Sequence, residues 1–152
     1  MSGISDLLYY KVDEKARKYG NTDLPLVIAV WGRSHPDQYA YETALYGHEG
    51  VRWYRDRDGN VVKNSIRSGR QPDGIFTLIE DGLLKNRKVS VVVFYECRLG
   101  DTDHQHLLRV YHNPNALNPL PQEIFDGVPQ FVPVEVDGHI EMRWINSPPD
   151  EN

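Results

Sequence analysis

Apolar side chains near the N-terminus recur with the period of an amphipathic helix. Between residues 4 and 19 they stand three and four positions apart, and charged side chains fill most of the positions between them. This spacing puts the apolar set on one helical face, and Gly20 is a residue type that ends helices. We therefore predict a helix over residues 4–19. Its expected core face consists of Ile4, Leu7, Leu8, Val12, Ala16 and Tyr19.

Two uninterrupted apolar runs predict strands. Residues 24–31 contain no charged side chain and do not alternate between apolar and polar. This pattern is typical of a central strand with both faces covered. Residues 88–98 contain a second run, from Val89 to Tyr95, and we expect it to be equally buried.

A second helix is predicted between the two strands, over residues 35–46. Ser34 is a capping residue and Gly47 a helix-ending residue. We expect its core face to hold Tyr39, Ala40 and Leu45. The alternation of helices and buried strands predicts an α/β fold, in which both helices pack on a mixed central sheet.

Two tight turns predict β-hairpins. Asp58-Gly59 lies within residues 51–62, and Asp137-Gly138 lies within residues 131–145. An Asp-Gly pair between apolar stretches favours the two-residue turns of antiparallel hairpins.

The remaining segments carry weaker patterns. We expect a loop over residues 63–73, a short helix over 75–84 and a third strand over 107–111. A single helical turn is expected near 122–125, and the polar, proline-containing end, 147–152, is expected to be a disordered tail.

Composition places these elements in one domain, residues 1–146. The chain has 152 residues, 39 % of them hydrophobic, and a net charge of −5. An acidic chain does not bind nucleic acid over its whole surface, so any such contact would be local. The single cysteine, Cys97, excludes an internal disulfide and multi-cysteine zinc sites. With no signal peptide and no apolar run long enough to cross a bilayer, we expect a cytoplasmic protein without a membrane partner.

One pair of acidic residues suggests metal chemistry. Asp73, followed later by Glu96 and Arg98, approximates the Asp and Glu-x-Lys pattern of metal-dependent nucleases, whose carboxylates hold Mg²⁺. Arg98 stands where lysine is usual, and arginine stays protonated and is a poor base. The alternative is that Asp73 belongs to an ordinary turn and that Glu96 and Arg98 form a solvated strand end.

Two further groups have a chemical and a structural interpretation. Asp101, Asp103, His104 and His106 could hold a divalent ion, with His112 one strand away, but they lack the spacing of a known site and loops are rich in these residues. Cys97 with a histidine could form a nucleophile pair, although a lone cysteine at the end of an apolar strand is more often a core residue.

The hairpin around Asp58-Gly59 interleaves cations with aromatic rings, a combination that grips phosphates and stacks on bases. The alternative is an ordinary exposed hairpin in which Asp56 and Asp58 cancel much of the charge. The candidate nucleic-acid-binding residues are Arg52, Trp53, Tyr54, Arg55 and Arg57. Further cations expected nearby are Arg67, Arg70, Lys85, Arg87 and Lys88.

Several short segments, in order, carry a resemblance to a known group of proteins. They are residues 15–20, 24–30, 44–47, 73–76, 88–93 and 111–114. Together they resemble the C-terminal half of uncharacterised bacterial proteins with a restriction-endonuclease-like, PD-(D/E)xK, fold.

The resemblance implies that the acidic catalytic residues lie on strands that precede the helix over 4–19. The chain would then be the non-catalytic C-terminal portion of such a protein, and a partner polypeptide would supply the N-terminal half. Two alternatives stay open. The chain could be a nucleic-acid- or protein-binding module without chemistry, or a complete Mg²⁺-dependent nuclease that uses Asp73 and Glu96.

Overall fold

The computed structural model describes residues 3–19, 23–32, 38–65, 67–99 and 104–147. Its centre is a five-stranded mixed sheet with the strand order β1-β6-β7-β8-β9. β1 pairs parallel with β6, and β7 pairs parallel with β8, while the other two neighbouring pairs are antiparallel. The strands are β1 (Leu26–Gly32), β6 (Val89–Leu99), β7 (His104–His112), β8 (Gln130–Val136) and β9 (His139–Ile145).

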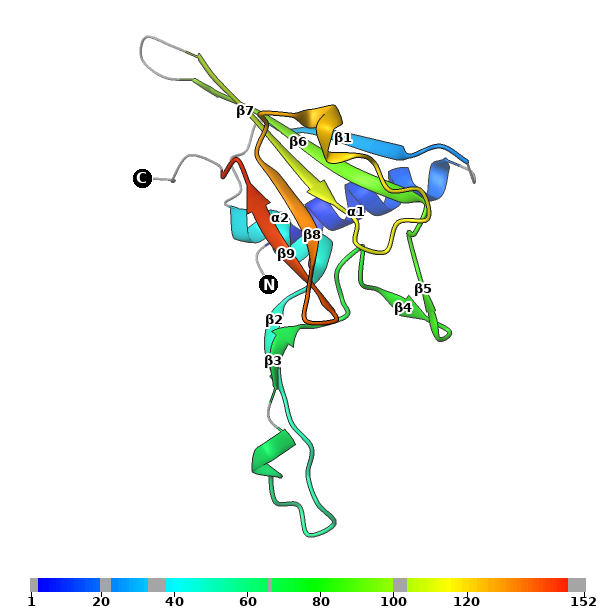
Figure 1. Ribbon diagram of the computed structural model, residues 1–152, viewed down its shortest axis with the longest axis vertical. Coiled ribbons are helices and arrows are strands. Elements are labelled where there is room, and N and C mark those ends of the chain that lie inside the picture. Colours follow the sequence, from blue (N-terminus) through cyan, green and yellow to red (C-terminus); the bar gives the residue numbers. More distant parts are fainter. Residues whose placement is uncertain (1–2, 20–22, 33–37, 66, 100–103, 148–152) are drawn as a thin grey trace.

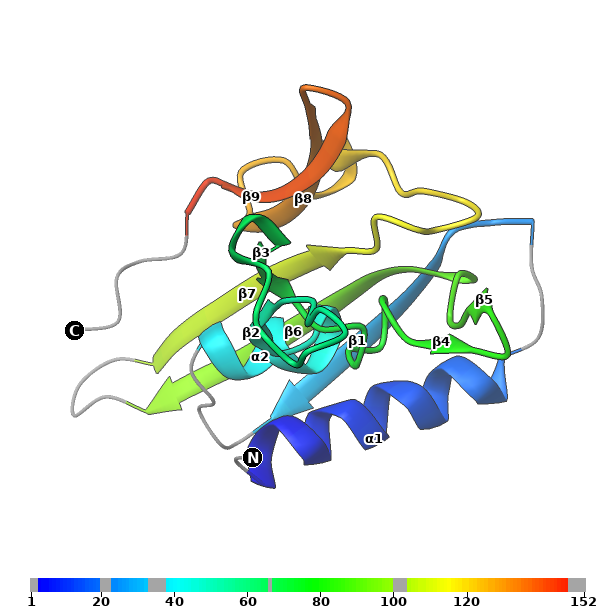
Figure 2. The ribbon, with the colours of Figure 1, turned by 90° about the horizontal axis from the view of Figure 1, so that it is seen from below.

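Two helices, α1 (Gly3–Lys18) and α2 (Gln38–Tyr46), pack on one face of this sheet (Figures 1 and 2). Between helices and sheet lies the main core, in which aromatic rings pack edge-on and tilted against one another. The rings belong to Tyr41, Tyr46, Phe76, Phe94, Tyr111 and Phe131. The α/β fold with a mixed sheet and two packed helices is thus confirmed.

The opposite face of the sheet has a smaller core. Val91, Val93 and Val110 are buried there beneath Leu120, Phe125 and Val128 of the segment that joins β7 to β8. That segment contains η2 (Gln122–Phe125), the single helical turn predicted from the sequence. β6 is therefore covered on both faces, as its apolar run indicated.

The position of β1 differs from the prediction. It is an edge strand, and Val27 and Trp31 are 40 % and 60 % exposed. An apolar run without alternation does not distinguish a strand buried on both faces from an edge strand with one open face. The prediction of a central strand at residues 24–31 was wrong.

Other differences concern single side chains and short elements. Leu7 and Tyr19 of the first predicted core face are exposed, and so is Tyr39 of the second, where Tyr41 is buried instead. Residues 75–84 form no helix. Ile75 and Phe76 are buried in a turn, and the short strands β4 (Ile79–Glu80) and β5 (Leu83–Leu84) follow around Asp81-Gly82, which both have positive φ.

The predicted hairpin over residues 51–62 is the outer part of a longer one. β2 (Glu49–Arg52) pairs with β3 (Arg67–Arg70), and η1 (Lys63–Ser65) lies between them. The expected loop over 63–73 is therefore partly regular. The hairpin of β8 and β9 is confirmed in full, with Asp137-Gly138 at its turn. Among the described residues we find no helix that could span a bilayer.

Candidate nucleic-acid interface

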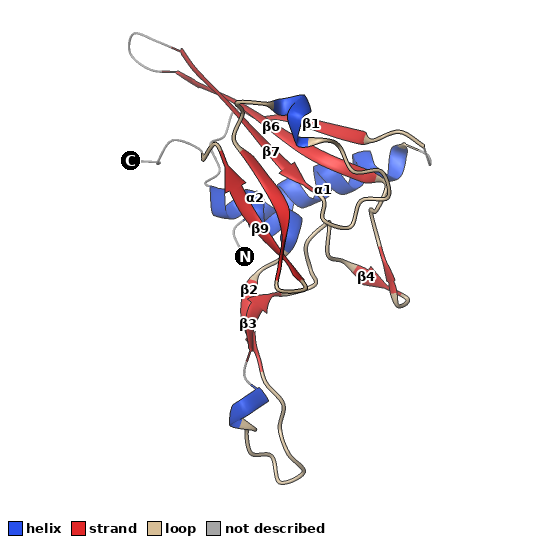
Figure 3. Ribbon diagram, in the orientation of Figure 1, coloured by secondary structure: helices blue, strands red, loops and turns tan. Residues whose placement is uncertain are grey.

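Residues 49–70 form a hairpin arm that leaves the body of the molecule at the end of α2 (Figures 1 and 3). At its base, β2 and β3 make an antiparallel ladder that pairs Arg52 with Arg67. The side chains of Arg52 and Arg67 lie outside the described residues. Farther out, a bridge between Arg55 and Val61 continues the pairing.

The tip of the arm, around Asp58-Gly59, has several hydrogen bonds among its own residues. Gly59 has a φ of +84°, which a side chain would disfavour. The Oδ1 atom of Asp56 accepts hydrogen bonds from the backbone amides of Asp58 (3.0 Å) and Asn60 (2.9 Å). Arg55 donates from Nη1 to the carbonyl of Gly59 (2.7 Å). The sequence prediction of a turn at Asp58-Gly59 is confirmed, and these hydrogen bonds stabilise the turn.

Aromatic and cationic side chains of the arm are open to solvent. Trp53 is 49 % exposed and Tyr54 is 76 % exposed, and Arg55, Arg57 and Lys63 are exposed beside them. An exposed tryptophan and tyrosine on one projecting element give two platforms on which bases can stack, next to cations that can reach phosphates.

The net charge of the arm is opposite in sign to that of the remaining residues. The arm contains six arginine and lysine residues against Glu49, Asp56 and Asp58, a net charge of +3. The whole chain carries −5, so the remaining residues carry −8. No acidic residue occurs between Asp58 and Asp73. An anionic polymer would therefore be attracted to the arm and repelled by the body.

The root of the arm, where β2 begins and β3 ends, is attached to α2. Arg70 donates to Glu42 Oε2 (2.7 Å) and to the carbonyl of Gly47 (3.0 Å), and the amide of Gln71 donates to the carbonyl of His48 (2.7 Å). Arg70 therefore attaches the arm to α2 and to Gly47.

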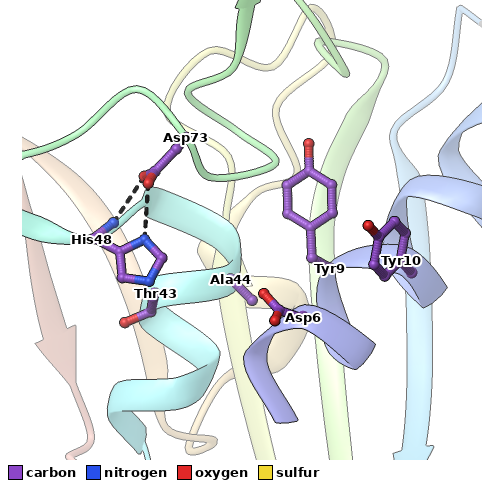
Figure 4. A pocket seen from close by; sticks show the side chains of 7 residues that line it. All are labelled: Asp6, Tyr9, Tyr10, Thr43, Ala44, His48 and Asp73. Carbon is purple, nitrogen blue, oxygen red and sulfur yellow. Dashed lines mark hydrogen bonds and ion pairs between the residues drawn. The ribbon is translucent and has the colours of Figure 1, made fainter. Parts of the chain in front are cut away.

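The two residues that flank the arm meet at this root. His48 donates its backbone amide to Asp73 Oδ1 (2.9 Å), and its Nδ1 lies 2.8 Å from Asp73 Oδ2. They form one wall of a cavity of about 250 Å³ between α1 and α2 (Figure 4). The cavity is lined by Asp6, Tyr9, Tyr10, Thr43, Ala44, His48 and Asp73.

The contacts of Asp73 set its protonation. Partial burial raises its pKa, but the hydrogen bonds from the amide and ring of His48, together with the charge of that ring, outweigh burial and lower the pKa below its usual value. Asp73 is therefore a carboxylate at neutral pH. The Nδ1 atom of His48 faces this carboxylate directly.

Glu96 lies elsewhere and has a different environment. It is 2 % exposed in β6, where it accepts a hydrogen bond from the hydroxyl of Tyr41 and lies 3.4 Å from Nη1 of Arg109, itself 3 % exposed. The expected solvated strand end is wrong for Glu96. Tyr41 belongs to the first half of α2, whereas Asp73 contacts His48 beyond the last turn. No described contact joins Asp73 to Glu96, and the side chain of Arg98 lies outside the described residues.

The other candidate residues are dispersed. Asp101, Asp103 and the side chain of His104 lie outside the described residues. His106 stacks on Tyr95, with ring centroids 5.8 Å apart. Within the described residues, no three His, Cys, Asp or Glu side chains form a cluster that could hold a metal ion. Mg²⁺ binding therefore stays a prediction.

Cys97 and His112, two further candidates from the sequence, lie partly or fully within the protein interior. Cys97 is half-buried and pairs with His106 in the β6–β7 register, but the contact described for the His106 ring is with the hydroxyl of Tyr95. His112 is buried, and its Nε2 lies 2.8 Å from Gln130 Oε1. Burial lowers the pKa of His112, and the contact with Gln130 opposes this only in part.

The remaining cations fall into two groups. Arg67 and Arg70 belong to the arm. Lys85, Arg87 and Lys88 line a separate cavity of about 360 Å³ beside Ala16 and Arg17 of α1. Lys85 pairs there with Glu80 (3.3 Å), and Arg87 donates to the carbonyl of Asn115 (3.1 Å). They are not part of the arm surface.

Sequence reasoning missed His48 and its pairing with Asp73, which is 25 positions away. The signal that could have found the pair is the hairpin between them. Closing an antiparallel hairpin brings together the residues just before and just after it, so a histidine and an aspartate in those positions are candidates for contact.

No protein-family model matches this chain, and neither the curated proteins nor the solved structures contain a match to it. The restriction-endonuclease-like relationship therefore stays a prediction, and any functional proposal must be carried by the geometry of the arm and its root.

Proposed function

We propose that this chain is a binding module for single-stranded nucleic acid, and that the arm is its contact surface. The observation that carries the proposal is the separation of charge, with +3 on a projecting hairpin and −8 on the remaining residues. A phosphate backbone gains from contacts with the arm and is kept off the body.

The aromatic residues of the arm favour a single strand over a duplex. Trp53 and Tyr54 offer faces for unstacked bases, which a duplex keeps stacked on one another. The hydrogen bonds of the tip support binding, because a stabilised turn loses less conformational entropy when a ligand docks.

This proposal does not need a catalytic centre. It is compatible with a non-catalytic portion of a restriction-endonuclease-like protein that works with a partner, although that relationship is a separate prediction. We do not propose a complete nuclease built on Asp73 and Glu96, because each of these carboxylates has its own contacts at a different end of α2.

The test is the salt dependence of binding to a fluorescent oligothymidylate of about 12 nucleotides, followed by anisotropy. Each phosphate contact on a single strand adds about 0.7 to the slope of log affinity against log salt. Replacing Arg57 and Lys63 together by alanine should weaken binding and lower that slope by about 1.4.

The matched control is the double variant Lys15→Ala/Lys18→Ala, which removes the same charge from exposed positions in the last turn of α1. It should keep nearly the wild-type slope. If the arm variant and this control behave alike, or if the wild-type protein does not bind at low salt, the arm is not a nucleic-acid interface.

A further inference from the structure

The cavity at the root of the arm has a chemistry unlike that of the arm. Its lining contributes two carboxylates, Asp6 and Asp73, and no arginine or lysine. Figure 4 shows Asp6 and Tyr9 of α1 on one side of the space, with His48 and Asp73 on the other. A phosphate group would be repelled here, so the cavity suits another part of a nucleic acid or another ligand.

The cavity contains two groups that, when ionised, only accept hydrogen bonds. Asp6 presents two carboxylate oxygens, and Asp73 presents two more, which contact the amide and the ring of His48. The carboxylates of the cavity favour a ligand with adjacent N–H donors.

The walls of the cavity favour a flat ligand. The rings of Tyr9 and Tyr10 meet nearly at right angles, with centroids 6.0 Å apart and an interplanar angle of 84°. Tyr10 is 70 % exposed, so its ring is available for stacking. Burial, followed by the charge of Asp13, raises the pKa of Tyr9, which keeps its phenol protonated. A volume of about 250 Å³ accommodates one planar group of this kind and not a drug-sized molecule.

Among nucleobases, guanine fits this pattern best. Its N1–H and N2–H₂ groups are adjacent donors that can engage both oxygens of one carboxylate, in the two-bond geometry that carboxylates form with arginine. Adenine and cytosine place an acceptor beside their amino group, and that acceptor would face a carboxylate oxygen. Thymine and uracil have a single N–H between two carbonyl groups.

We infer that this cavity binds an unstacked guanine base of a single strand whose phosphates follow the arm, with Asp6 on the Watson–Crick edge of the base and Tyr10 against its face. The inference rests on the proposed function and adds base selectivity to it. His48 and Asp73 line the cavity and flank the arm, which places the cavity at the root of the arm.

The experiment compares labelled oligothymidylates that differ in one central nucleotide, which is thymine, guanine, adenine or hypoxanthine. Hypoxanthine lacks only the 2-amino group of guanine. The guanine oligonucleotide should bind roughly tenfold tighter than the all-thymine one, as one good two-bond base contact allows. Hypoxanthine should lose most of that gain.

The variant Asp6→Asn replaces one acceptor by a donor and should abolish the preference for guanine while leaving binding of the all-thymine strand and its salt slope unchanged. The matched control is Glu14→Gln, which removes one negative charge from an exposed position of the same helix outside the cavity. It should keep the preference. Thermal melting of both variants checks that they are folded.

The outcomes separate the two ideas. If all four oligonucleotides bind equally and with a salt slope, the guanine site is wrong and the arm proposal stands. If the guanine strand is preferred but Asp6→Asn keeps the preference, the cavity is not the site. If no strand binds, both ideas fail.

Discussion

The ion pair between Glu96 and Arg109 offers a direct test of whether Glu96 is a structural residue or a metal ligand. Both side chains are almost fully buried, 2 % and 3 % exposed, and the Oε1–Nη1 distance is 3.4 Å. Glu96 also accepts the hydroxyl of Tyr41, and the Arg109 guanidinium lies 5.8 Å from the centroid of the Tyr41 ring. Replacing either Glu96 or Arg109 by an apolar residue would leave the other charged side chain buried without this ion pair.

The expected magnitude follows from this geometry. At 3.4 Å and an effective dielectric constant of about 20, the Coulomb attraction is about 5 kcal/mol. Breaking a buried pair by removing one partner typically costs about 3–5 kcal/mol. We expect Glu96→Leu and Arg109→Met each to lower the free energy of unfolding by that amount, which corresponds to a drop in melting temperature of roughly 6–20 °C for a chain of this size.

The double variant Glu96→Leu/Arg109→Met should be far less unstable than the sum of the two single variants. With both charges gone, neither is left buried without the other, and the loss of the Glu96 acceptor of the Tyr41 hydroxyl costs about 1–3 kcal/mol. Urea denaturation of the four proteins gives the coupling energy. A coupling energy near zero, or a fully stable Glu96→Leu protein, would refute the structural role and return Glu96 to the candidates for metal binding.

Two further predictions concern stability. The Gly74→Ala variant should lose about 3 kcal/mol or more of unfolding free energy in urea denaturation, because its new Cβ would lie 2.2 Å from the backbone nitrogen of Gly47. The control Gly69→Ala has nothing within 4 Å of its new Cβ and should be close to wild type. Equal stability of the two variants would contradict the close packing of residues 45–47 against Gly74. For His112, burial lowers the pKa below its ordinary 6.5, so the unfolded chain takes up the proton first and the stabilising contribution of the neutral ring is lost as pH falls below about 6.5. Unfolding free energies measured from about pH 7.5 to 5 should therefore decline more steeply in wild type than in His112→Gln, and parallel curves would show that this histidine is not the cause.

The sequence predicted elements more reliably than their positions in the fold. β6 and the hairpin of β8 and β9 were found because a buried run and an Asp-Gly turn are local signals. β1 was placed in the middle of the sheet because its composition matches a covered strand, yet strand order depends on long-range pairing that composition does not encode. The missed hairpin of β4 and β5 did have a local signal, Asp81-Gly82, which the apolar residues around it obscured.

The candidate site was predictable only in part. The cations and aromatic rings of the arm are consecutive in sequence, so they were identified together. The cavity combines Asp6, Thr43 and Asp73 from three distant segments, and only the packing of α1 on α2 and the closure of the arm bring them together. Glu96 shows the opposite case, because its acidic side chain suggested chemistry until burial beside Arg109 gave it a structural partner.

The attachment of the arm makes its outer part a replaceable unit. The ladder of β2 and β3 and the contacts of Arg70 fix the root, and the hydrogen bonds described for residues 53–62 are all to other residues of the arm. Insertions, deletions and exchanges at such a tip change little in the body that supports it. Related chains could therefore vary the length and chemistry of this hairpin freely while keeping the same sheet, and a tip from another protein could be grafted between Gly50 and Gly69 to redirect the scaffold to a new ligand.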